Sequence, residues 1–145
     1  MSPNTRIDFY VLQNRSPNGH LKLACRIVGK AYKLGHRVYM KTKNLDESLI
    51  LDDFLWTFAQ NSFIPHQLDN HSRNRASPVL IGEQPTPDDT DIVVSLTNEP
   101  LSDFNTFSRI AEVVGFEDDD KTSARKRFRY YRELGVEPTT HHITL

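Results

Sequence analysis

The first part of the chain switches between the two-residue spacing of strands and the spacing of amphipathic helices. Residues 6–12 are rich in aromatic and branched side chains and predict a strand. Apolar residues then recur at helical spacing over 20–34. Residues 36–42 predict a second strand, and a second helix follows over 45–55, with Asn44 placed to cap it. Strand, helix, strand, helix at this spacing is the pattern of α/β domains with parallel sheets.

The second half of the chain is less regular. A short apolar run at 78–81 follows a polar stretch. The segment 92–96 is the most strand-like, and its continuous branched residues predict a central strand covered on both faces. Residues 110–116 are predicted as a further strand and 117–134 as the final helix. Because no repeat or linker is visible, we expect a single α/β domain with a mostly parallel sheet flanked by helices.

Composition limits the classes of protein to which the chain can belong. It has 145 residues, 37% of them hydrophobic and 26% charged, as expected for one folded domain with a buried core. No apolar run approaches the roughly 18 residues that a membrane span requires. Residues 1–6 lack the pattern of a secretion signal, so we expect a cytoplasmic protein. The net charge is −1, so any anion-binding surface must come from local segregation of charge.

Patterns that would support catalysis or cofactor binding are missing from the sequence. Neither glycine-rich phosphate-binding motif occurs, and the turn at 13–19 contains one glycine, so we expect a mononucleotide-binding-like fold without a phosphate loop. The six histidines show no zinc-ligand spacing, and His141 and His142 on an extended tail point to opposite sides. Cys25 falls on the apolar stripe of the first helix, where a buried thiol is expected. We therefore expect no metal, no cofactor and no enzymatic activity.

The final helix concentrates charge. Four carboxylates at 117–120 stand where the positive end of the helix dipole favours them, and six cations follow within twelve residues. An ordinary well-formed helix shows the same order, so the order alone does not identify a binding surface. The angular positions are more informative, because at about 100° per residue five side chains share one face. These are Lys121, Arg125, Phe128, Arg129 and Arg132.

The remaining positions of this helix predict its buried side. Ala124, Tyr131 and Leu134 point to a different sector, which is expected to pack on the sheet, and Arg127 falls within that sector. Phe128 lies between the two sectors, so it either seals the edge of the core or forms the floor of a pocket surrounded by arginines.

A cationic face with an aromatic ring at its border suits two kinds of partner. Single-stranded nucleic acid would stack bases on rings and place phosphates on cations. An acidic peptide with a hydrophobic residue would use the arginines for its carboxylates and the pocket for its side chain. With one ring on the face and a slightly acidic chain, the peptide is favoured over the nucleic acid.

A second aromatic cluster lies around the only tryptophan. Trp56, Phe58 and Phe63 span a predicted helix end and a turn before Pro65. Each ring can belong to the core, and we assign Phe58 to it. Full burial of all three rings is hard to arrange at such an edge, so an interface role for Trp56 and Phe63 is the alternative.

Taken in order, these segments resemble the chi subunit of bacterial DNA polymerase III holoenzyme. The resemblance covers nearly the whole chain and no single motif is diagnostic. The segments that carry it are Phe9-Tyr10-Val11-Leu12, Leu55-Trp56, Ser62-Phe63-Ile64-Pro65-His66, Asp91-Ile92-Val93-Val94-Ser95-Leu96 and Ala124-Arg125-Lys126-Arg127-Phe128-Arg129-Tyr130-Tyr131-Arg132. Residues 69–89 match poorly, and we transfer no function to them.

The resemblance implies a non-enzymatic clamp-loader accessory subunit with two protein partners. One is the psi subunit, which would meet Trp56 and Phe63, where a helicase is a possible competitor. The other is the acidic C-terminal tail of the single-stranded-DNA-binding protein, which ends in phenylalanine. Carried over by position, the tail site comprises Val114, Lys121, Arg125, Phe128, Arg129 and Arg132. The family commonly has Tyr at position 128 and Lys at position 129, so a hydroxyl is lost and a charge is kept. DNA would be contacted only indirectly.

Overall fold

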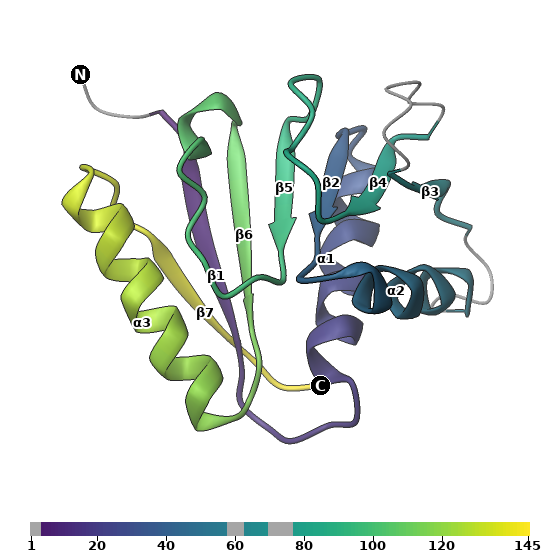
Figure 1. Cartoon of the computed structure of the whole chain (residues 1–145). Coiled ribbons are helices and arrows are strands. Elements are labelled where there is room, and N and C mark those ends of the chain that lie inside the picture. Colours follow the sequence, from purple (N-terminus) through teal and green to yellow (C-terminus); the bar gives the residue numbers. More distant parts are fainter. Residues whose placement is uncertain (1–3, 58–62, 70–76) are drawn as a thin grey trace.

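Seven strands in the described part of the chain form one sheet, in which every pair of neighbours is parallel (Figure 1). The computed structural model describes residues 4–57, 63–69 and 77–145. The strand order is β3-β4-β2-β5-β6-β1-β7. The strands are β1 (Arg6–Leu12), β2 (Val38–Lys41), β3 (His66–Leu68), β4 (Val79–Gly82), β5 (Ile92–Ser95), β6 (Arg109–Val114) and β7 (Thr139–Ile143). The predicted α/β class with a parallel sheet is confirmed.

Helices cover both faces of this sheet. On one face, α1 (Gly19–Lys33) and α2 (Leu45–Thr57) pack together over a shared core. On the other face lies α3 (Asp118–Glu133), with a short 3-10 helix, η1 (Phe104–Thr106), in the same core. None of the helices in the described chain has the length and apolarity that crossing a bilayer would require.

The alternation of side chains along the strands creates these two cores. In β5, Ile92 and Val94 belong to the core under α1 and α2, whereas Val93 belongs to the core under α3. All four residues of β5 are buried, so the prediction of a strand covered on both faces is confirmed. In β2, Tyr39 is buried as well, and its hydroxyl donates a hydrogen bond to the Asp69 carboxylate at 3.1 Å.

Most element predictions are confirmed with small shifts at the ends. The first strand has the predicted bounds, and the first helix is displaced by one residue at each end. Asn44 does cap α2, because its side-chain oxygen accepts a hydrogen bond from the Glu47 amide at 2.9 Å. The strand predicted over 110–116 is β6, which ends at Val114 because Gly115 and Phe116 lead into α3.

Neither edge strand of the sheet was predicted from the sequence. The tail that carries His141 and His142 is β7, which pairs with β1 along its length. Its sequence, Thr-Thr-His-His-Ile, has no alternation of apolar and polar residues, since an edge strand buries little on either side. The expectation that the two histidines point to opposite sides holds: His141 Nε2 lies 2.8 Å from Asp8, and His142 lines a groove beside α3. The other edge strand, β3, has only three residues and a mixed burial pattern.

Candidate functional site

A buried ion pair holds α3 on the sheet. Nε of Arg127 lies 3.3 Å from a carboxylate oxygen of Glu112 on β6, and both side chains are almost completely buried. The Tyr131 hydroxyl donates a hydrogen bond of 2.7 Å to the same carboxylate and accepts one of 2.8 Å from the Leu101 amide. Burial raises the pKa of Glu112, and the nearby Arg127 opposes that rise. These contacts fix the side of the helix that faces the sheet.

The predicted buried sector of α3 is partly right. Ala124 and Tyr131 are buried, and Arg127 is buried with them because Glu112 supplies the opposite charge. The prediction for Leu134 is wrong, because 47% of this residue is exposed. The helix ends at Glu133, so Leu134 is the capping residue outside it, and Gly135, with a φ of 92°, then turns the chain.

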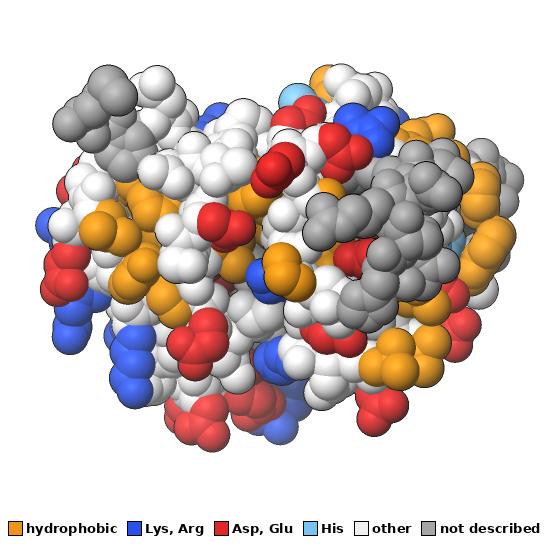
Figure 2. Space-filling model, turned by 45° about the horizontal axis from the view of Figure 1, so that its top comes forward, with side chains coloured by type: hydrophobic (Ala, Val, Ile, Leu, Met, Phe, Trp, Pro, Cys, Tyr) orange, Lys and Arg blue, Asp and Glu red, His pale blue; other side chains and the backbone are white. Residues whose placement is uncertain are grey.

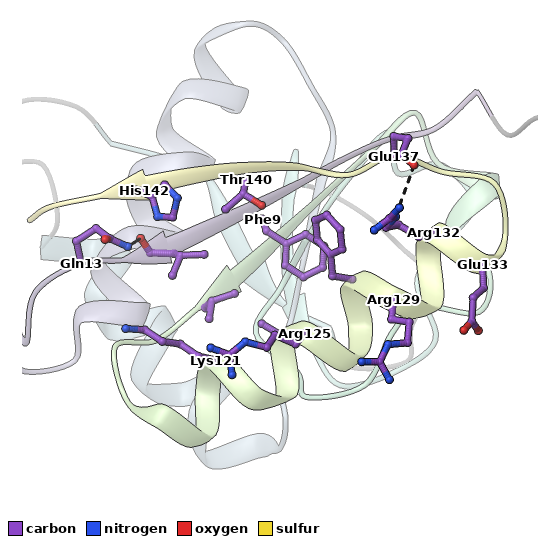
Figure 3. Close-up of a pocket in the computed structure, with 14 residues that line it drawn as sticks. Phe9, Gln13, Lys121, Arg125, Arg129, Arg132, Glu133, Glu137, Thr140 and His142 are labelled. Carbon is purple, nitrogen blue, oxygen red and sulfur yellow. Dashed lines mark hydrogen bonds and ion pairs between the residues drawn. The ribbon is translucent and has the colours of Figure 1, made fainter.

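A groove of about 810 Å³ separates α3 from strands β1 and β7 (Figure 3). Its apolar surface comes from both sides, with Phe9, Val11 and Val114 on the strands and Ala124 and Phe128 on the helix. Polar side chains surround this floor, from α3 below and from the β1 and β7 side above in the view of Figure 3. The groove thus combines an apolar floor with charged groups around it.

All six residues of the predicted tail site line this one groove. Lys121, Arg125, Phe128, Arg129 and Arg132 come from successive turns of α3, and Val114 comes from the end of β6. The structure brings them together because β6 runs directly into α3, which then packs back antiparallel to the strands (Figure 1). Their role in binding remains a prediction, but their common location is a property of the fold.

Phe128 contributes to both the core and the groove. Its ring is half-buried, with its centroid 5.4 Å from that of Phe9, and it also lines the groove. Phe9 in turn contacts Tyr131, with centroids 6.2 Å apart. An aromatic pair of this kind adds to burial and fixes both rings. The two roles left open for Phe128 by the sequence are therefore combined in one position.

The cations of the groove differ in their surroundings. The Lys121 ammonium lies over the Phe116 ring, 4.9 Å from its centroid. Arg132 is paired with Glu137 at 3.6 Å. Within the described residues no ion pair is found for Arg125 or Arg129, and both are exposed. These two guanidiniums are the ones most accessible to an anion.

The sequence did not identify the wall of the groove opposite α3. Phe9, Gln13, Thr140 and His142 complete it from β1 and β7, and Glu133 and Glu137 lie at its far end. The register that places Phe9 opposite Thr140 depends on the pairing of β1 with β7. The one available signal was the alternation in β1, which puts Phe9 and Val11 on the same face.

A second candidate surface lies at the end of α2. Trp56 is 57% exposed and Phe63 is 55% exposed, and their rings stack with centroids 5.0 Å apart. The edge of the stack meets His66, whose Nε2 lies 3.1 Å from Asp52. Of the two roles left open for Trp56 and Phe63, core or interface, the exposure of both rings is compatible with the interface. Phe58, which we assign to the core, lies outside the described residues.

The exposed aromatic pair continues an apolar stripe along α2. Leu45, Leu49 and Trp56 fall within about 40° of one another on the helix, and Leu45 and Leu49 are 57% and 46% exposed. Figure 2 shows hydrophobic side chains at the surface on the right-hand side of the molecule, where α2 lies in Figure 1. Exposed apolar residues in a continuous stripe are typical of protein interfaces.

The carboxyl ends of the strands, where α/β proteins often bind nucleotides, hold a smaller hollow of about 240 Å³. Its exposed cations, Arg15 and Lys43, are accompanied by the carboxylates of Glu117 and Asp120. The described residues contain no cluster of three or more potential metal ligands. Neither observation favours a nucleotide or metal site.

The chain is similar to known proteins over nearly its whole length. Residues 4–139 match the model of the family described as DNA polymerase III chi subunit, HolC. The chain belongs to the DNA polymerase III chi-subunit family. It is 36% identical over 140 residues to the DNA polymerase III subunit chi of Pseudomonas aeruginosa, covering 96% of this chain and 97% of the relative. It is 30% identical over 139 residues to the same subunit of Escherichia coli, covering 91% and 94% of the two chains.

Membership in the chi family assigns the chain to DNA replication. A third relative, the subunit chi of Haemophilus influenzae, is 25% identical over 138 residues. These relatives are subunits of a polymerase by name, so this chi-family chain is an accessory subunit of the DNA polymerase III assembly. The resemblance that we inferred from the ordered segments is confirmed.

Proposed function

We propose that the groove beside α3 binds the acidic C-terminal tail of single-stranded-DNA-binding protein. In this way the accessory subunit would link the polymerase assembly to coated single-stranded DNA. The observation that carries the proposal is the apolar floor at Phe9 and Phe128 next to the exposed guanidiniums of Arg125 and Arg129. A peptide with acidic side chains and a terminal phenylalanine matches both parts of this surface.

The terminal phenylalanine ring would fill the apolar hollow, and Phe128 would contact its face or edge. Arg125 stands one helical turn before Phe128, so its guanidinium can hold the terminal carboxylate or a neighbouring acidic side chain in a bidentate arrangement. Arg129 and Lys121 would attract the remaining carboxylates. The partly enclosed position of the groove strengthens these contacts relative to open solvent.

Direct binding of single-stranded nucleic acid by α3 is the alternative function. Stacking of bases requires exposed ring faces. Phe128 is half-buried and the Phe9 ring beside it is buried, so the groove offers a single phenylalanine ring on which a base could stack, whereas single-stranded nucleic acid is usually bound by several. The geometry therefore favours the peptide, and a gel shift with a naked oligonucleotide, with and without the coating protein, separates the two functions.

We further propose that the exposed surface around Trp56 and Phe63 binds the psi subunit. The stacked rings would serve as the anchor, and Leu45 and Leu49 would extend the contact along α2. A helicase is a possible competitor for this surface. Through psi, the chain would be attached to the clamp loader while the groove on the other face remains accessible.

The tail site is tested by calorimetric titration with a synthetic acidic peptide that ends in phenylalanine. We expect Arg125→Ala to weaken binding by about 2 kcal/mol or more, roughly 30-fold, which is the scale of a hot-spot ion pair. Arg26→Ala, an exposed arginine on α1, is the matched control and is expected to change the affinity less than two-fold. Equal affinities for the wild type and Arg125→Ala would show that the tail binds elsewhere.

A further inference from the structure

The groove beside α3 has two chemically different ends. Lys121, Gln13 and His142 lie at one end in Figure 3, and Arg132, Glu133 and Glu137 lie at the other. None of the carboxylates at 117–120 lines the groove. The only carboxylates among its lining residues are therefore those of Glu133 and Glu137, near the last turn of α3.

Arg132 already has a carboxylate beside it. Its Nε lies 3.6 Å from Oε1 of Glu137, which stands two residues before the start of β7. The side chains of Arg132 and Glu137 are 58% and 82% exposed, so the pair is open to solvent and to competition. The carboxylate of Glu137 therefore lies beside a cation that a carboxylate of a bound peptide would otherwise contact.

The other cations of the groove are not neutralised in this way. The Lys121 ammonium lies over an aromatic ring, which leaves its charge in place. In the part of the chain that the structure describes, Arg125 and Arg129 have no ion-pair partner. An acidic peptide would therefore find three cations without a competing carboxylate and a fourth that shares its charge with the protein.

We propose that Glu137 competes with an acidic peptide for Arg132 and so keeps this end of the groove from holding the peptide's carboxylates. The proposal rests on the function proposed above for the groove. Glu137 would then be a specificity-determining residue: the acidic part of the peptide lies on Lys121, Arg125 and Arg129, and Arg132 contributes only when Glu137 is removed. Because exposed pairs are weak, the effect is a tuning of affinity, not an on-off switch.

The chain provides a matched control in Glu133. This residue lines the same end of the groove and carries the same charge, and among the described residues it has no ion pair with Arg132. Glu133→Gln removes one negative charge without freeing Arg132, whereas Glu137→Gln removes the same charge and does free it. Both side chains are exposed, so neither substitution is expected to disturb folding.

The test measures the affinity of a fluorescent acidic peptide ending in phenylalanine for five proteins at low ionic strength. These are the wild type, Glu137→Gln, Glu133→Gln, Arg132→Ala and the double variant Glu137→Gln with Arg132→Ala. We expect Glu137→Gln to tighten binding about two- to five-fold, and Glu133→Gln and Arg132→Ala to change it less than two-fold. In the Glu137→Gln background, Arg132→Ala removes the whole gain, because the two residues act as a pair.

Two results would overturn the inference while leaving the proposed function intact. One is a loss of peptide affinity on Arg132→Ala, made in the wild-type background, that is as large as the loss on Arg125→Ala. Arg132 would then bind the peptide as fully as Arg125 does. The other is an equal gain in peptide affinity for Glu133→Gln and Glu137→Gln, with the gain for Glu137→Gln remaining when Arg132 is also replaced by Ala. Such a gain would reflect the net charge of the chain alone. Absence of peptide binding to the wild type would instead overturn the proposed function and this inference with it.

Discussion

The guanidinium of Arg127 and the carboxylate of Glu112 lie 3.3 Å apart between α3 and β6, and both side chains are nearly inaccessible to solvent. Tyr131 supplies a hydrogen bond to the carboxylate, and Ser123 accepts one from Arg127. Because each charge has a partner, the pair tolerates its burial, but neither residue can be removed alone without leaving a buried charge. The pair thereby fixes the position of α3 on the sheet, and with it the groove between α3 and strands β1 and β7.

We expect Arg127→Met to lower the free energy of unfolding by about 3–5 kcal/mol, because Glu112 is then left buried without its cation. Replacing both residues, as Arg127→Met with Glu112→Gln, is expected to recover a large part of this loss. Denaturant unfolding of the wild type, the two single variants and the double variant measures the coupling. A double variant as unstable as the sum of the single ones would show that the two residues are independent.

Cys25 allows a second test at the level of one residue. The side chain is fully buried, and burial raises the pKa of its thiol to about 12. The folded chain therefore retains the proton at pH values where the unfolded chain, with a pKa near 9, releases it. Stability is unaffected below about pH 9 and falls as the pH rises towards 12.

Between about pH 9 and pH 12 we expect the free energy of unfolding of the wild type to fall by about 1.4 kcal/mol per pH unit relative to that of Cys25→Ala. Denaturant unfolding of both proteins at pH 8 and pH 10.5 gives the change in unfolding free energy with pH for each. The titration of all other groups contributes equally to both proteins, so the difference between them reports on Cys25. The thiol is also expected to resist thiol reagents at pH 8 until the protein unfolds. Parallel pH dependences of the two proteins, or rapid labelling of the native protein, would contradict the burial.

At the level of elements, α2 is a helix with one side in the core and an apolar stripe in solvent. Leu51 and Leu55 are buried, whereas Leu45, Leu49 and Trp56 are exposed. Exposing apolar surface in this way has no benefit for an isolated domain, since burial would stabilise it. The stripe is explained if α2 is covered by a partner.

We expect Trp56→Ala and Phe63→Ala each to weaken binding of the psi subunit by about 2 kcal/mol or more and to leave tail-peptide binding unchanged. Titration with purified psi and, separately, with the acidic peptide gives both quantities. Leu34→Ala is the control, because Leu34 is a highly exposed leucine at the end of α1 and does not belong to the stripe on α2. An effect of Leu34→Ala equal to that of Trp56→Ala would indicate non-specific apolar contact.

At the level of the whole molecule, the two candidate surfaces lie on opposite faces of the sheet. The groove is built by α3 with β1 and β7, whereas the exposed stripe belongs to α2, which packs on the other core. Among the residues that the structure describes, the two surfaces share none. This arrangement permits one chain to hold two partners at once, as the linking function proposed above requires.

We therefore expect the affinity for the acidic peptide to change less than two-fold when psi is present at saturation. The affinity for the peptide is expected to fall with increasing salt, while a naked oligonucleotide is bound weakly at every salt concentration, because the net charge of the chain is −1. Fluorescence anisotropy with labelled peptide and labelled oligonucleotide measures all three quantities. Mutual exclusion of psi and peptide, or tight binding of bare oligonucleotide that salt abolishes, would contradict the two-surface arrangement.

Sequence alone was enough for most of the elements and for the face of α3 that carries charge, because both follow from the spacing of residues within a single segment. It placed Lys121, Arg125 and Arg129 on one side of the helix, as the structure has them. It could not give the partner of Arg127, the opposite wall formed by Phe9 and its neighbours, or the weak edge strand β7.

Those features were decided only by the tertiary structure, because they depend on which distant strands become neighbours. β1 lies between β6 and β7, so residues from the two ends of the chain form one groove with α3. The burial of Arg127 is favourable only where Glu112 lies beneath it, and the state of Arg132 depends on Glu137 across the turn. Local spacing sets which side chains a helix presents, and long-range packing sets what each of them meets.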